Sequence, residues 1–181
     1  MITRILLTIA LALCAGVVSQ AVAQQRDHLT PQEVDLVKEA QILDKRIDVF
    51  IKAAERRLMV INNAAGANAK QLKKDSERWG ELPTGSRAEL VSDIARILDE
   101  AITNIDDVSA RDERNPLIAK SLRKLATSVN TIMGQLKPLS EQAKSDAEIA
   151  SFEMLNEDAQ SILEAANKLP AEVEKKAKKN K

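Results

Sequence analysis

The chain has 181 residues, and its 27 basic and 27 acidic side chains leave a formal net charge of zero. Proteins that bind nucleic acid carry a strong basic excess, so this balance argues against nucleic acid as a partner. Aromatic residues make up only 2% of the chain, so a core must be built from Leu, Ile, Val and Ala, which is typical of helical bundles.

Residues 1–23 have the pattern of a secretory signal peptide. A charged start containing Arg4 precedes an almost wholly apolar run over residues 5–18, and a small-x-small cleavage site ends at Ala23. We expect cleavage after Ala23 and a protein located in the periplasm or outside the cell. The alternative is a leader that is retained as an anchor, because the apolar run approaches the minimum length of a membrane span.

The only cysteine, Cys14, lies inside this leader. Lipidation of Cys14 is disfavoured, because bacterial lipoprotein signals have a small residue before the cysteine and Leu13 is not small. After cleavage the protein has no cysteine for a disulfide, a metal site or nucleophilic catalysis. It also has no stretch that would make a stable membrane span.

Residues 30–61 predict one long helix of about 45 Å, around which we expect the fold to be organised. Thr30 and Glu33 are spaced for a capping box, and Pro31 suits the first helical position. Arg57 interrupts the apolar stripe of this helix. We expect the aliphatic part of the Arg57 side chain to pack at the helix edge with its charged end in water. The alternative is a buried ion pair between Arg57 and a carboxylate of the fourth helix. The stripe consists of Leu36, Ala40, Leu43, Ile47, Phe50, Ala54 and Ile61.

A second apolar line on nearly the opposite side of this helix defines a possible partner surface. It consists of Ile42, Val49, Ala53 and Val60. In a simple bundle this side of the helix faces water, so the four residues need another explanation. Three remain open: cover by the long connection over residues 67–85, self-association, or no role at all.

Three further helices are expected after that connection. The connection itself is expected to be structured, with Trp79 plugging one end of the core. Ser86 and Glu89 form a second capping box, and a polar loop is expected over residues 106–115. The helices cover residues 86–108, 116–137 (ending before Pro138) and 139–169.

The expected fold class is all-α: an antiparallel up-down-up-down four-helix bundle with a long first helix and a structured loop between helices 1 and 2. It spans residues 24–170 and is followed by a basic, disordered tail over residues 171–181, for which weak contact with an anionic surface is a second interpretation. The first helix is neutral, the second and fourth are acidic, and the third is basic. We therefore expect the third helix between the two acidic ones, diagonally across from the first.

No catalytic, cofactor-binding or metal-binding residue is predicted. His28 is the only histidine and lies before the first cap, where we expect it to be exposed on a fraying terminus. Neither the paired E-x-x-H motifs of di-iron bundles nor a Ser–His–acid triad can be built from it. Residues 106–113 cluster carboxylates that a hard cation prefers, but they lack the EF-hand pattern and are expected to form a solvated loop.

These patterns favour a non-enzymatic binding or structural module that acts through an unknown protein partner or by self-association. The alternative is a metal-dependent or carboxylate-based enzyme that uses acids of the second and fourth helices. Carboxylates that converge in a concave site with shifted pKa values would favour the enzyme.

Overall fold

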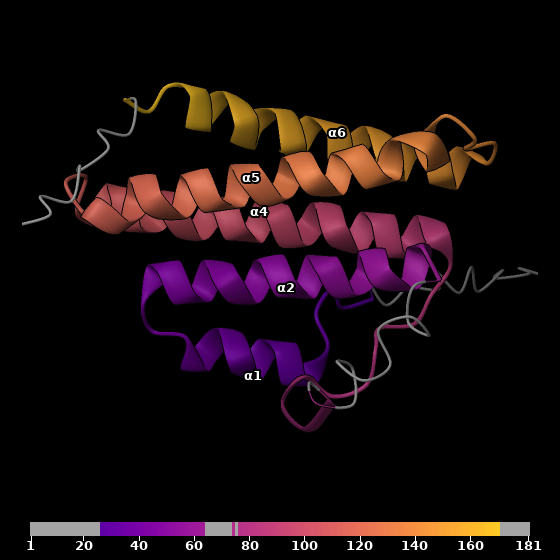
Figure 1. Cartoon of the computed structure of the whole chain (residues 1–181), viewed down its shortest axis with the longest axis horizontal. Helices are drawn as coiled ribbons and strands as arrows, with labels where there is room; N and C mark the ends of the chain where they lie inside the picture. Colours follow the sequence, from indigo (N-terminus) through magenta and orange to yellow (C-terminus); the bar gives the residue numbers. More distant parts are fainter. Residues whose placement is uncertain (1–25, 64–73, 75, 171–181) are drawn as a thin grey trace, which may run out of the picture.

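The computed structural model describes residues 26–63, 74 and 76–170 of the chain (Figure 1). These residues are all-helical, as the sequence predicts, and none of their helices is long and apolar enough to cross a membrane. The expected leader over residues 1–23 and the basic tail over residues 171–181 lie outside the described part of the chain. The long helices are α1 (Pro31–Glu39), α2 (Leu43–Ile61), α4 (Arg87–Arg111), α5 (Pro116–Ser140) and α6 (Asp146–Asn167).

The expected long first helix is in fact two helices, so that prediction was wrong. The chain reverses at residues 40–42, where Ala40 and Ile42 leave helical geometry, and α1 lies back along the outer side of α2 (Figure 1). A continuous helix would leave the second apolar line of α2 in water. Folding α1 onto that line buries Val49 and Ala53, and a fully buried Val contributes roughly 1.5–3 kcal/mol, which offsets the lost helical turn.

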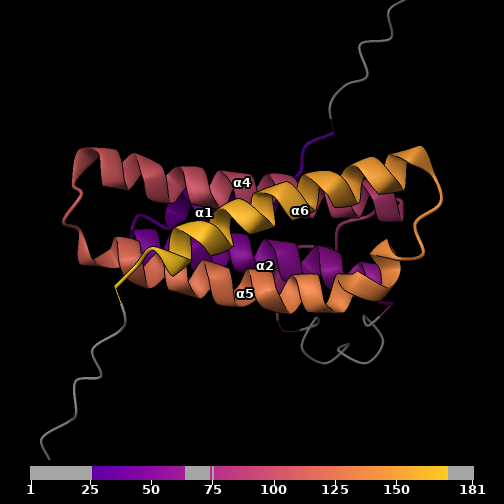
Figure 2. The same cartoon turned by 90° about the horizontal axis from the view of Figure 1, so that it is seen from above.

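Four of the helices surround one apolar core. Figure 1 shows α6 as one layer, α4 and α5 as the next, then α2, with α1 outermost. Figure 2 shows that α6 crosses over α4 and α5 at an angle. Phe50 of α2 is completely buried, as predicted. The other large apolar side chains that are almost completely buried include Ile47, Leu90, Ile94, Ile97, Leu98, Ile105, Leu125, Ile132, Leu136, Leu155 and Ile162.

Neighbouring helices differ from the arrangement expected from charge. The acidic helices α4 and α6 form the most extensive helix pair, and the basic α5 packs mainly against α6 and α2. Helix α2 therefore lies diagonally across from α6, with no close approach between their backbones, and not diagonally across from α5. Exposed ion pairs contribute only about 0–1 kcal/mol each, so the apolar faces decide which helices pack together.

The basic helix α5 finds its counter-ions on α2. Lys124 Nζ lies 2.7 Å from Asp44 Oδ1 and 2.6 Å from Asp48 Oδ1, and Lys120 Nζ lies 3.0 Å from Asp44 Oδ2. Hydrogen bonds from Lys124 and Lys120 lower the pKa of Asp44. Helix α2 has five basic and three acidic residues, but its acids Asp44 and Asp48 lie near its start, where they pair with the lysines of α5.

Both capping boxes are present, at Thr30 with Glu33 and at Ser86 with Glu89, but several helix ends differ from expectation. Helix α4 continues to Arg111, so residues 106–111 are helical and not a loop. Helix α5 passes through Pro138 and ends at Ser140, because a proline two residues from an exposed helix end removes a single hydrogen bond. Helix α6 therefore begins later than predicted.

Candidate functional site

Four charged side chains are buried together where α1, α2 and α4 meet, and we call them the ion cluster. They are Glu33 of α1, Arg56 and Arg57 of α2, and Asp93 of α4, and they are 0%, 1%, 1% and 4% exposed. Taking such groups out of water costs several kcal/mol per ion unless each is paired and hydrogen-bonded. The contacts of these four side chains therefore determine how the surrounding segments are held.

Glu33 is the shared counter-ion of both arginines. Its Oε1 accepts hydrogen bonds from Arg56 Nε at 3.1 Å and from Arg57 Nη1 at 2.7 Å. Its Oε2 accepts from the backbone N–H of Thr30 at 2.9 Å. The glutamate that the sequence identifies as a cap thus also attaches α1 to α2.

Arg56 holds residues 79–81, near the end of the long connection. Its Nη2 donates to the backbone carbonyls of Trp79 at 3.1 Å and Gly80 at 3.3 Å, and also to that of Glu81. Its guanidinium carbon lies 5.7 Å from the centroid of the Trp79 ring, within the range of a cation–π contact. Gly80 has φ +66°, which a glycine adopts without strain, and this backbone turn lets the carbonyls converge on Arg56.

Arg57 and Asp93 hold the segment that precedes α1. Arg57 Nη2 donates to the carbonyl of His28 at 2.7 Å, and Arg57 Nε lies 3.8 Å from Asp93 Oδ2. Arg26 Nη2 donates to the same Asp93 oxygen at 2.8 Å. Burial raises the pKa of Asp93, and the guanidiniums of Arg26 and Arg57 oppose that rise.

Two predictions about this region were wrong. His28 is not exposed on a fraying end: its Nε2 lies 2.8 Å from Glu100 Oε2, and Arg96 donates to the carbonyl of Arg26 at 3.1 Å. Arg57 is not packed at a helix edge but is buried. A buried pair was the alternative for Arg57, although its carboxylates come from α1 and α4 and not from the last helix.

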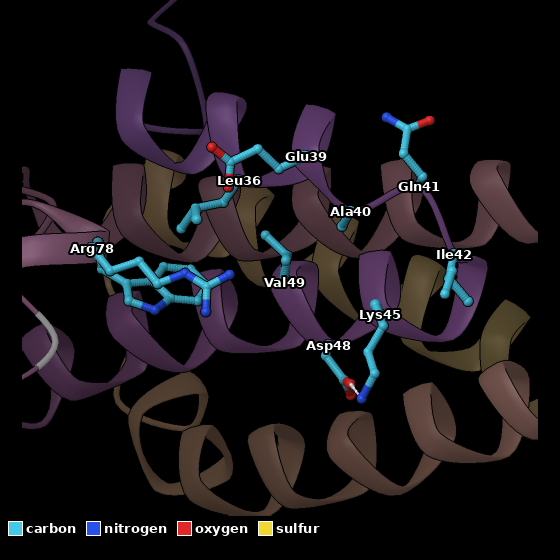
Figure 3. A pocket seen from close by; sticks show the side chains of 10 residues that line it. Leu36, Glu39, Ala40, Gln41, Ile42, Lys45, Asp48, Val49 and Arg78 are labelled. Atoms are coloured by element: carbon cyan, nitrogen blue, oxygen red, sulfur yellow. Dashed lines mark ion pairs between the residues drawn. The ribbon is translucent and has the colours of Figure 1, made fainter.

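A groove of about 540 Å³ opens beside the ion cluster, between α1, α2 and the Trp79 segment (Figure 3). Ligand sites in proteins commonly have volumes of roughly 300–1,000 Å³, so the groove is large enough to bind a partner group. Its apolar lining is Leu36, Ala40, Ile42, Val49 and Trp79, and its polar lining is Glu39, Gln41, Lys45, Asp48 and Arg78.

The four residues of the predicted partner surface have different positions in the structure. Val49 is buried at the base of the groove, and Ile42, which is 57% exposed, lies at one end of it (Figure 3). Ala53 is completely buried, and Val60 is partly buried. Trp79 lines the same groove as Val49, so α1 and the end of the long connection together cover this side of α2. Trp79 is partly buried, packs against the apolar core and lines the groove.

The acids of α4 and α6 do not line this groove. Burial, together with like-charge repulsion from Asp99 and Glu157, raises the pKa of Asp158 to about 6. Neither Asp99 nor Asp158 is among the residues that line the groove. Within the described ranges, no group of three or more His, Cys, Asp or Glu side chains is placed to hold a metal ion.

Comparisons with known proteins give no indication of function, so a function must be argued from the geometry of the site. No protein-family profile matches the chain, and no curated protein or solved structure matches it. The ion cluster could not be found from the sequence as one unit, because Glu33 and Asp93 lie 23 to 37 positions from the adjacent Arg56 and Arg57 and meet them only after the chain folds back. The one sequence feature that points to the ion cluster is Arg57, which interrupts the apolar stripe of the expected first helix.

Proposed function

We propose that the protein is an exported, non-enzymatic binding module that holds a protein partner in the groove. The observation that carries this proposal is that the ion cluster fixes both sides of the groove. Glu33 attaches α1 to α2, and Arg56 attaches the Trp79 segment to the same stretch of α2. Because the walls of the groove are already held in place, binding of a partner does not require free energy to order them.

The chemistry of the site supports binding over catalysis. The sole histidine, His28, is engaged with Glu100 and does not line the groove, and the sole cysteine belongs to the expected leader. The carboxylate with the strongly raised pKa, Asp158, lies outside the groove. We therefore rank the carboxylate-based enzyme second, and its test is whether Asp158→Asn abolishes an activity that the groove variants below leave intact.

Export and fine architecture belong to the same proposal. We propose that residues 1–23 are removed after Ala23 and that α2, α4, α5 and α6 form a bundle in which consecutive helices alternate in direction, with α1 as an added layer. Intact-mass measurement of the exported protein tests the first part. A mass that begins at Gln24 is expected, and a retained leader or a lipid adduct on Cys14 would overturn it.

Position-specific photo-crosslinking tests the groove. A photoreactive phenylalanine analogue replaces Ile42 in the full chain, and a matched protein carries it at Ile149, an exposed isoleucine of α6. We expect a discrete adduct from position 42 in the native envelope, which excess unmodified protein competes away. Equal adducts from both positions, or none from position 42, would remove the groove as the binding site.

A further inference from the structure

The groove has helical walls, and this restricts what can lie in it. The backbone N–H and C=O groups of α1 and α2 are already hydrogen-bonded inside their own helices. An extended segment in the groove would therefore leave its own backbone groups without protein partners, which is costly where water is displaced. A helix brings its backbone hydrogen bonds with it, so helix-in-groove binding fits these walls better than strand addition.

The apolar lining has the length of two helical turns. Ile42, the N-cap residue of α2, and Val49 of α2 are seven positions apart, which corresponds to about 10.5 Å at 1.5 Å per residue. Leu36 of α1 and Trp79 complete the apolar lining at the Val49 end. A partner helix that presents apolar residues at i, i+3 or i+4, and i+7 covers this length.

The charged lining is complementary to a partner that carries both signs. Lys45 and Asp48 form an ion pair at 3.8 Å. Glu39, on α1, and Arg78, beside Trp79, also line the groove, but neither forms an ion pair with any residue of the described ranges (Figure 3). One acid and one base are thus available to a ligand.

We propose that the groove takes one amphipathic helix of a partner protein. Its apolar residues lie against Leu36, Val49 and Ile42, a basic residue lies beside Glu39, and an acidic residue lies beside Arg78. This inference rests on the proposed function, which requires only that some partner occupies the groove. It adds the secondary structure of the bound segment and the positions of its charges.

Trp79 is the only tryptophan of the chain and lines the groove, so its emission reports binding directly. The probe is an end-blocked, alanine-based peptide of about 14 residues with leucines at helical spacing, one lysine and one glutamate. The control peptide has the same composition with its leucines at alternate positions. We expect the helical peptide to shift the emission saturably and the control peptide to bind about tenfold or more weakly.

Three variants of the mature protein locate the contact. Ile42→Glu is expected to weaken the helical peptide about tenfold or more, because a carboxylate replaces an apolar contact. Ile149→Glu is the matched control, since both isoleucines are exposed (57% and 41%), and it should bind as the parent does. Arg78→Glu should weaken binding, and a peptide with lysine in place of its glutamate should restore it.

The outcomes separate this inference from the proposed function. Equal binding of the two peptides, equal effects of the two isoleucine variants, or no rescue of Arg78→Glu overturns the helical partner. If the helical peptide fails while position 42 still yields its adduct in the envelope, the groove binds a partner of another shape. If both fail, the groove is not a binding site.

Discussion

Helix α4 meets charge in opposite ways on its two sides. Toward α1 and α2, Asp93 is buried among guanidiniums, including Arg26 at 2.8 Å. Toward α6, Asp158 meets Asp99 and Glu157, and burial with like charge raises its pKa to about 6. Deep burial is tolerated only where opposite charges pair, whereas a partly exposed acid can relieve repulsion by taking up a proton. The comparison shows that burial of apolar faces determines which helices pack against α4. The charged side chains then either form ion pairs or shift their pKa values.

The largest expected effect is at the centre of the ion cluster. Glu33→Gln keeps the shape of the side chain but leaves Arg56 and Arg57 without their shared carboxylate, so the free energy of unfolding should fall by about 3–5 kcal/mol. Urea unfolding followed by circular dichroism measures this. Glu39→Gln, at an exposed position of the same helix, is the matched control and should stay within about 0.5 kcal/mol. Equal effects of the two changes would mean that the cluster does not stabilise the fold.

The loss of stability from Glu33→Gln can be compared with the loss from removing a core side chain. Phe50 is completely buried in the core that α2 shares with its neighbours, so Phe50→Ala should cost about 3–5 kcal/mol through lost contacts and a residual cavity. Glu55→Ala, on the exposed side of α2, should lie within about 0.5 kcal/mol of the parent in the same urea titration. A Phe50→Ala loss well below that of Glu33→Gln would show that charge pairing outweighs apolar packing in this protein.

The ion pairs between Asp44 of α2 and the lysines of α5 should make stability depend on pH. Because Lys124 and Lys120 lower the pKa of Asp44 below its ordinary value of 3.8, their stabilisation is present above pH 3.8 and is lost as the pH falls through the lowered pKa. Asp44→Asn should cost about 1–2 kcal/mol at pH 7, and this cost should shrink as the pH falls below 3.8. Thermal unfolding at pH 7 and pH 3 measures both. The same loss at both values would argue against the ion pairs as its cause.

Asp158 should behave in the opposite sense. Its folded-state pKa of about 6 exceeds the ordinary value of 3.8, so its contribution to stability is full below pH 3.8 and is lost as the pH rises through about 6. Asp158→Asn should raise the stability at pH 7 by roughly 1 kcal/mol, discounted for partial exposure, and should flatten the change between pH 7 and pH 5. Urea titrations at pH 5 and pH 7 test this, with Asp146→Asn as an exposed control on α6. An unchanged pH dependence would contradict the raised pKa of Asp158 and its repulsion by Asp99 and Glu157.

The sequence predicts the helical class and both capping boxes because those signals are local. It does not predict the reversal at residues 40–42, since Ala40 and Gln41 are good helix formers and no glycine or proline marks a break. Burial of the second apolar line outweighs that local preference. The groove follows from the reversal, so its lining could not be assembled from the sequence, although Ile42 and Val49 were singled out by their pattern.

Helix charge sums also conceal information that the structure uses. The neutral sum over residues 30–61 combines α1, which has three acids and one base, with α2, which has three acids and five bases. Asp44 and Asp48 near the start of α2 contact α5, and Arg56 and Arg57 near its end contact Glu33 of α1. A sum over residues 30–61 hides these opposite charges, so the expected neighbours were wrong where the positions of individual charges would have been informative.

The contacts around residues 26–33 have a consequence for the order of folding. Arg26 meets Asp93 at a separation of 67 residues, and His28 meets Glu100 at a separation of 72. Contacts this distant in sequence close large loops and form slowly. In a chain that emerges from a ribosome or a translocation channel with its N-terminus first, Arg26 and His28 must therefore wait for Asp93 and Glu100 before their side chains have partners. Helix α1 is too short to persist alone, so the first residues to emerge are among the last to fold.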